Sequence, residues 1–242
     1  MRCDLKARPV RQVAGIEGTP LRGARPGGAS SGAGAGALWR KSSPAPSAMS
    51  RFACPEPPGV ALHLIQRGRG RARCFFGARD GIAYLRWLRE YAMRFECAVH
   101  AYVLMRNHVH LLVTPARERG GSDLMRSLGG CYARHVADTR GLAGPLWEER
   151  FEAAPVYVPR YLLSCMRYIE ENPVRAGLAS DPGEYRWSSY GANAWGREDP
   201  LVTPHALYYA LGRSPEWRRA RYRAMFWRPT SPAPSTSPAG NR

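Results

Sequence analysis

The strongest constraint on the fold is a pair of apolar stretches separated by only two polar residues. Residues 97–105 (CAVHAYVLM) and 108–114 (HVHLLVT) are rich in branched and aromatic side chains, and only Arg106 and Asn107 lie between them. A connection this short joins the two strands of an antiparallel hairpin. Pro115 follows at once and lacks a backbone N–H, so the second strand is expected to end there. The sequence therefore predicts a sheet that contains this hairpin.

Further strand-like and helix-like segments flank the hairpin. Residues 60–66 and 155–158 are expected to be strands, and residues 81–95, 122–139 and 160–172 to be helices. Ser122 is a candidate N-cap for the second helix, and Pro173 is expected to end the third at Asn172. The order β-α-β-β-α-β-α predicts an α+β domain in which helices pack on one face of an antiparallel sheet.

The two ends of the chain differ in composition from its middle. Residues 1–48 are rich in Gly, Ala, Pro, Ser and Arg, and residues 228–242 in Pro and Ser. Such segments bury too little apolar surface to offset the entropy of ordering, so both are expected to be disordered. We expect the main domain over residues 49–195 and a helical accessory segment over residues 196–227. Met49 directly follows the extension, so Met1 and Met49 are both candidate translation starts.

The charge balance indicates a polyanionic partner. The chain has 36 Lys and Arg against 19 Asp and Glu, a net charge of +17, which favours nucleic acid. Almost all of these cations are arginine, which a GC-rich genome alone could explain, although the planar guanidinium also suits phosphate. The six cysteines form no Cys-x-x-Cys pair, and no apolar run is long enough for a membrane span. A reducing, cytoplasmic setting is expected.

The second strand of the hairpin carries a His-x-His pattern. Side chains alternate between the faces of a strand, so Val109, Leu111 and Val113 share one face. His108 and His110 share the other, about 7 Å apart. Two neutral imidazoles at this spacing can converge on one metal ion, whereas the alternative is two ordinary histidines on a half-exposed strand. The other histidines, His63, His100, His135 and His205, are expected to be structural.

The last predicted helix adds a tyrosine and an asparagine. Its apolar stripe consists of Leu162, Cys165, Met166 and Ile169. Tyr168 lies beside this stripe, and Asn172 lies one turn later over the same face, where its amide oxygen could meet a metal or a phosphate-bound water. The alternative is a boundary tyrosine and a helix-capping asparagine. Glu148, Glu149, Glu170 and Glu171 are expected to be solvated.

Five sequence blocks in order resemble the single-tyrosine HUH transposases, most closely the REP-associated tyrosine transposases of bacteria. The blocks are residues 63–68 (HLIQRG), 105–112 (MRNHVHLL), 146–151 (LWEERF), 168–178 (YIEENPVRAGL) and 187–190 (WSSY). The match covers residues 55–195. The loop Arg69-Gly70-Arg71 departs from the asparagine-rich loop that the family often has at this place.

The resemblance implies a ferredoxin-like sheet and cleavage of single-stranded DNA, with hairpin-forming repeats as the expected substrate. It implies Tyr168 as the nucleophile, which would form a 5′-phosphotyrosine, and His108, His110 and Asn172 as ligands of Mg²⁺ or Mn²⁺. Arg67, Arg150 and Arg175 are candidate phosphate contacts, and Trp147 is a candidate for base stacking. The implied location is the bacterial cytoplasm, at the nucleoid; monomer and homodimer stay open, as do active transposition and another cellular use.

Three other functions compete with this one. A non-catalytic single-stranded DNA-binding protein could use the same fold. A replication or mobilisation initiator of the wider HUH class usually carries a helicase, and this chain has no Gly-x-x-x-x-Gly-Lys motif. A zinc hydrolase usually needs three protein ligands, and no His-Glu-x-x-His motif is present.

Overall fold

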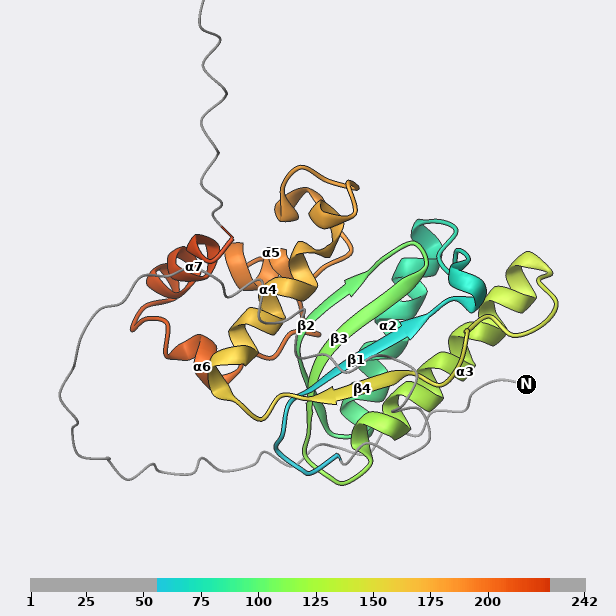
Figure 1. Cartoon of the computed structure of the whole chain (residues 1–242), viewed down its shortest axis with the longest axis horizontal. Helices are drawn as coiled ribbons and strands as arrows, with labels where there is room; N and C mark the ends of the chain where they lie inside the picture. The colour runs from blue at the N-terminus through green and yellow to red at the C-terminus, as the bar shows by residue number, and fades with distance from the viewer. Residues whose placement is uncertain (1–55, 227–242) are drawn as a thin grey trace, which may run out of the picture. The chain divides into compact units, whose positions relative to one another are not determined.

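The computed structural model describes residues 56–226 of the chain. The predictions made for residues 1–48 and 228–242 lie outside the described residues. A four-stranded sheet contains β1 (Leu62–Arg67), β2 (Cys97–Leu104), β3 (His108–Pro115) and β4 (Glu152–Pro155) in the order β2-β3-β1-β4 (Figure 1). All neighbouring strands are antiparallel.

Three long helices connect and follow the strands. They are α2 (Ala78–Arg94), α3 (Gly120–Arg140) and α4 (Pro159–Arg175), and they give the order β-α-β-β-α-β-α. This order and the split β-α-β arrangement confirm the predicted α+β, ferredoxin-like fold. Within residues 56–226, no helix is long and apolar enough to span a membrane.

The two faces of the sheet are covered by different helices. Val109, Leu111 and Val113 of β3 are fully buried on the face that α2 and α3 cover, as predicted. The expectation of helices on one face is nevertheless incomplete, because α4 covers the other. The reason is that this second face is also apolar: Ala101 and Leu112 are buried there against the stripe on α4.

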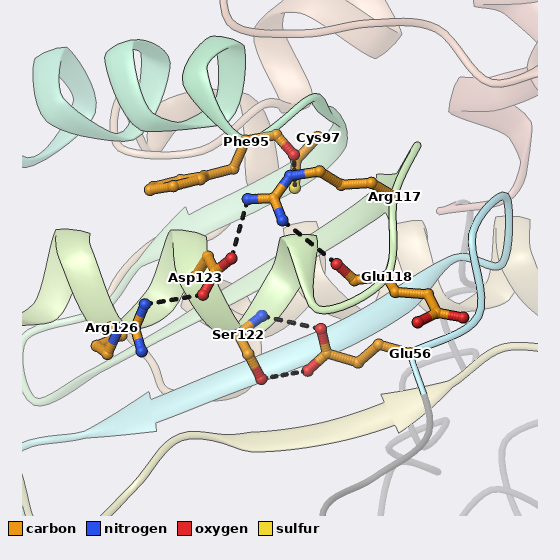
Figure 2. Close-up of polar contacts among 8 residues, drawn as sticks. All are labelled: Glu56, Phe95, Cys97, Arg117, Glu118, Ser122, Asp123 and Arg126. Carbon is orange, nitrogen blue, oxygen red and sulfur yellow. Dashed lines mark hydrogen bonds and ion pairs between the residues drawn. The ribbon is translucent and has the colours of Figure 1, made fainter.

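The predicted N-cap of α3 is wrong. The helix begins at Gly120, so Ser122 lies inside its first turn. Figure 2 shows that Glu56 takes the capping role instead, because its carboxylate accepts hydrogen bonds from the Ser122 backbone N–H at 2.9 Å and from the Ser122 hydroxyl at 2.5 Å. A carboxylate also complements the positive end of the helix dipole. Nearby, Asp123 pairs with both Arg117 and Arg126 at 2.9 Å.

Helix α4 does not end at Asn172 as predicted but continues through Pro173 to Arg175. Pro173 has no N–H to offer the carbonyl of Ile169 four residues earlier. The Asn172 side-chain amide compensates, since it donates to the carbonyl of Tyr168 at 2.8 Å and to that of Ile169 at 3.5 Å. The helix ends at Arg175, and Gly177, with a φ of +67°, allows the chain to turn away after the cap residue Ala176.

The short strand β4 also lies three residues earlier than predicted. It pairs with Leu62–Ile65 of β1 through Glu152–Pro155, where two alanines stand between a charged residue and a proline. No apolar alternation marks this segment, so its position depends on pairing with β1 rather than on its own pattern.

The C-terminal part of the described chain is helical. It contains η2 (Pro182–Glu184), α5 (Tyr190–Trp195), α6 (Ala206–Tyr209) and α7 (Pro215–Ala224). Buried side chains of α5, α6 and α7 join the same core cluster as the stripe on α4. Whether residues 196–227 form a separate unit stays a prediction.

A buried carboxylate ties these C-terminal helices to α4. Glu170 is fully buried and accepts hydrogen bonds from the Ser189 hydroxyl at 2.5 Å, the Asn193 amide at 2.8 Å and the Tyr222 hydroxyl at 2.8 Å. Burial raises the pKa of Glu170 to about 7, against the opposing effect of these donors. The expectation that Glu170 and Glu171 are solvated is therefore wrong, whereas Glu148 and Glu149 are exposed as expected.

Removing the carboxylate of Glu170 is expected to destabilise the protein strongly. Glu170→Ala leaves three buried donors without their shared acceptor, at about 1–3 kcal/mol each. Glu170→Gln keeps an oxygen in the same place and is expected to lose much less. Urea denaturation of the two variants measures the difference in the free energy of unfolding. Equal stability of the two variants would show that the shared acceptor is unimportant.

The pH dependence of stability provides a second check on Glu170. Its pKa in the folded protein, about 7, lies above the ordinary value of 4.5. The stabilisation linked to this shift is therefore fully present below pH 4.5 and is lost as the pH rises through 7. Relative to Glu170→Gln, the free energy of unfolding of the wild type should fall between pH 4.5 and 8. A difference that stays constant with pH would contradict this assignment.

Candidate active site

The sheet and α4 bring two histidines and a tyrosine together. His108 and His110 lie on the face of β3 that α4 covers, and their ring centroids are 5.0 Å apart. Tyr168 of α4 lies with its ring centroid 5.9 Å from that of His110. Tyr168 follows His110 by 58 residues in the sequence, so the packing of α4 on the sheet brings the tyrosine to the two histidines.

One ring nitrogen of His108 and one of His110 are each engaged in a hydrogen bond. The Nδ1 atom of His108 lies 2.8 Å from Oδ1 of Asn107. An amide oxygen only accepts, so this Nδ1 carries the proton and Nε2 keeps a lone pair. The Nδ1 atom of His110 lies 2.9 Å from Nε2 of His63. If His110 donates in this pair, its Nε2 also keeps a lone pair.

The surroundings keep both imidazoles neutral. Burial lowers the pKa of His108 to about 4, with further lowering by the charges of Arg67 and Arg71. Burial also lowers the pKa of His110 well below 6.5, and His63, His108 and Arg67 add to the effect. Near neutral pH each imidazole is therefore neutral and has one ring nitrogen with a lone pair that can bind a metal ion.

His63 also belongs to this group, although its sequence context indicated only a structural role. It is buried on β1, it bonds to His110, and its ring lies 6.1 Å from that of Tyr168. Burial, followed by the charge of Arg67, lowers its pKa to about 4. His63 shares one face of β1 with Ile65 and Arg67, because side chains alternate along a strand. Its contact with His110 depends on the register in which β1 pairs with β3.

Two of the predicted phosphate contacts lie beside the group. Arg175 is close to Tyr168, with its guanidinium carbon 5.1 Å from the centre of the tyrosine ring. Arg67 lies opposite His108 in the β1–β3 register, and it forms an ion pair with the exposed Glu152. Both arginines therefore place positive charge near the tyrosine and the histidines.

The other two predicted DNA contacts lie elsewhere. Arg150 donates to the Ser122 hydroxyl at 3.0 Å, and the Trp147 indole donates to the carbonyl of Gly129 at 2.9 Å. Ser122 and Gly129 belong to α3, which covers the face of the sheet opposite to the histidines. The structure does not bring Arg150 or Trp147 to Tyr168.

The imidazoles of His108 and His110 could hold a divalent metal ion. Within residues 56–226, no cluster of three or more His, Cys, Asp and Glu side chains is suited to a metal ion. The third predicted ligand, Asn172, lies one turn after Tyr168 on α4. The amide nitrogen of Asn172 is used within α4, which leaves its oxygen as the potential ligand. Neutral ligands leave the charge of the ion intact for an anionic substrate.

A pocket of about 400 Å³ opens beside His108. The turn that contains Arg71 and Arg73, the hairpin turn at Arg106 and Asn107, and the residues after α4 surround it. None of these three arginines was among the DNA contacts predicted from the sequence. The Arg69-Gly70-Arg71 loop was the signal that could have indicated them.

Comparison with known proteins shows similarity to one family of transposases. Residues 58–172 match the model of the IS200-like transposases. A solved structure of a REP-associated tyrosine transposase bound to a REP hairpin is similar in fold, with a TM-score of 0.52 and 18% identity over 65% of this chain and 93% of that chain. A candidate transposase from Deinococcus radiodurans R1 aligns with a TM-score of 0.35 and 20% identity over 50% of this chain and 93% of that chain. No curated protein sequence matches. Over residues 58–172, the chain is similar to the IS200-like transposases, in agreement with the resemblance noted from its sequence.

Proposed function

We propose that this protein is a transposase that cleaves and rejoins single-stranded DNA, with Tyr168 as its nucleophile. The main support is the position of the Tyr168 ring, about 6 Å from the rings of His63 and His110, with Arg175 beside it. A nucleophile next to neutral metal-ligand candidates and a cation suits attack on an anionic phosphodiester.

The proposed reaction exchanges one phosphate ester for another. The Tyr168 hydroxyl oxygen attacks phosphorus and loses its proton to solvent, while the bond from phosphorus to the 3′ oxygen breaks. The 3′ oxygen takes up a proton, and the 5′ phosphate stays on the tyrosine. A 3′ hydroxyl from the same or another strand then attacks this phosphotyrosine and releases Tyr168. Because the ester bond is conserved throughout, strand transfer needs no ATP.

We propose His108, His110 and Asn172 as the residues that hold a divalent ion, through their Nε2 atoms and the amide oxygen. When bound, such an ion polarises a phosphate oxygen and offsets the developing negative charge. Mg²⁺ and Mn²⁺ both suit this role, and imidazole ligands favour Mn²⁺. Arg67 and Arg175 supply further positive charge at the phosphate.

The proposed substrate is DNA that folds into hairpins with single-stranded flanks. The support is the similarity to the IS200-like transposases together with the fold shared with a transposase that was solved bound to a REP hairpin. Action on chromosomal repeats would place the protein at the nucleoid. A non-catalytic DNA-binding protein on the same fold is the alternative.

A covalent protein–DNA adduct is the expected product of the first step. Labelled single-stranded hairpins from the flanks of the gene are incubated with Mn²⁺ or Mg²⁺ and run on a denaturing gel. Tyr168→Phe removes only the hydroxyl, and His110→Ala removes a proposed ligand, so both should abolish the adduct. Tyr161→Phe is the control, since Tyr161 is an exposed tyrosine on the same helix. Binding without an adduct in the wild type would instead support the non-catalytic alternative.

His63 is expected to position His110 for metal binding. An acceptor at Nδ1 of His110 keeps the proton there and directs Nε2 to the metal, and loss of such a partner typically weakens affinity 10–100-fold. His63→Ala should therefore raise the Kd for Mn²⁺ by about 10–100-fold, measured by electron paramagnetic resonance of the free ion. His63→Gln places an amide oxygen near the lost Nε2 and should restore most of the affinity.

The matched control for His63 is His135→Ala, because His135 lies on α3 at the other face of the sheet. Thermal melts show whether each variant is folded. The positioning role is refuted if His63→Ala binds Mn²⁺ as the wild type does, or if the Ala and Gln variants lose the same affinity while both stay folded.

A further inference from the structure

We propose that the pocket beside His108 binds the nucleotide next to the scissile phosphate and that Arg71, Arg73 and Arg106 contact the phosphate of that nucleotide. This inference rests on the proposed DNA-cleaving function and names a binding site within it. Of the pocket-lining residues, only His108 belongs to the group proposed above for metal binding and catalysis. The pocket is therefore next to the reacting group and separate from it.

The three arginines have side chains that are not paired within the described part of the chain. None of them forms an ion pair or donates a side-chain hydrogen bond among residues 56–226. By contrast, two other arginines of the domain, Arg67 and Arg140, pair with carboxylates. All three are exposed. Three such guanidinium groups around one concavity suit an anion with several oxygens, and phosphate is the anion that DNA offers.

The backbone holds these arginines in place. Gly70 and Arg71 have φ values of +57° and +59°, and the second is unfavourable for a residue with a side chain. Such a conformation persists only where neighbouring contacts fix it. Here the Gly68 N–H donates to the carbonyl of Asn107 at 2.8 Å, and the Asn107 amide donates to the carbonyl of Arg71 at 3.1 Å. The two turns that carry the arginines are thus joined to each other.

The rest of the pocket suits the less polar parts of a nucleotide. Met105, Ala176 and Leu178 provide apolar lining in addition to the arginines. A sugar or base can lie against such a surface while the phosphate meets the guanidinium groups, as in ligand sites that combine apolar surface with a few charged contacts. His108 lines the same pocket, so a nucleotide bound there continues directly to the phosphate at the proposed active site.

Salt dependence of DNA binding provides the first test. The proteins carry Tyr168→Phe so that no cleavage occurs, and binding to a fluorescent hairpin with single-stranded flanks is followed by anisotropy. The variant Arg71→Gln with Arg106→Gln should bind about tenfold or more weakly, the order expected when charged hydrogen bonds are removed. The slope of log affinity against log salt should fall by about 0.7 for each phosphate that the variant no longer neutralises.

The matched control removes two positive charges elsewhere. Arg89→Gln with Arg134→Gln changes exposed arginines of α2 and α3, on the other side of the sheet. Affinity and salt slope close to those of the unchanged protein are expected for this control. Equal losses in the two double variants would overturn the proposal, because only total charge would then matter.

Substitution of single phosphates provides the decisive test. Each phosphate of the flanks is replaced in turn by an uncharged methylphosphonate. One replacement next to the cleavage position should weaken binding to the Tyr168→Phe protein and should have no further effect on the variant that lacks Arg71 and Arg106. The same penalty in both proteins at every position would refute the pocket. If this pattern holds although the wild type forms no adduct, the proposed chemistry fails while the nucleotide pocket stands.

Discussion

The structure depends on the burial of one face of β3. Val109, Leu111 and Val113 are fully buried against α2 and α3, and this fixes which way every side chain of the strand points. A slip of one residue would turn these side chains toward α4 and would turn His108 and His110 toward α2 and α3. The hydrophobic core therefore sets the orientation of the histidine pair, although none of its side chains belongs to the site.

Helix α4 supplies the other half of the site, and local patterns predicted it only in part. Its apolar stripe was evident from the sequence, as were the hairpin and the first two helices, because periodicity is a local property. Its end was not, since the helix continues past Pro173, where the Asn172 side chain lies 3.5 Å from the carbonyl that the proline leaves without a backbone donor. The buried state of Glu170 could not be predicted either. Its three donors come from residues 189–222, and no local pattern connects such distant positions.

The same distinction explains what the sequence indicated about the site. His108 and His110 are two residues apart on one strand, so alternation alone places them together. His63 reaches His110 only through the register of β1 on β3, which the two strand patterns leave undetermined. Trp147 lies in a block that resembles the family, yet its indole donates to a carbonyl of α3. A sequence motif does not indicate which face of the sheet a side chain occupies.

Asn107 connects the proposed catalytic group to the arginine pocket. Its amide oxygen accepts from His108, and its amide nitrogen donates to the carbonyl of Arg71. These two contacts require an acceptor and a donor on one short side chain. Aspartate would provide only acceptors when ionised, and serine would provide a single oxygen on a shorter chain. The orientation of His108 and the position of the arginine turn therefore cannot vary independently. If a nucleotide in the proposed pocket moves the turn at Arg71, the Asn107 amide would transmit this movement to the imidazole of His108.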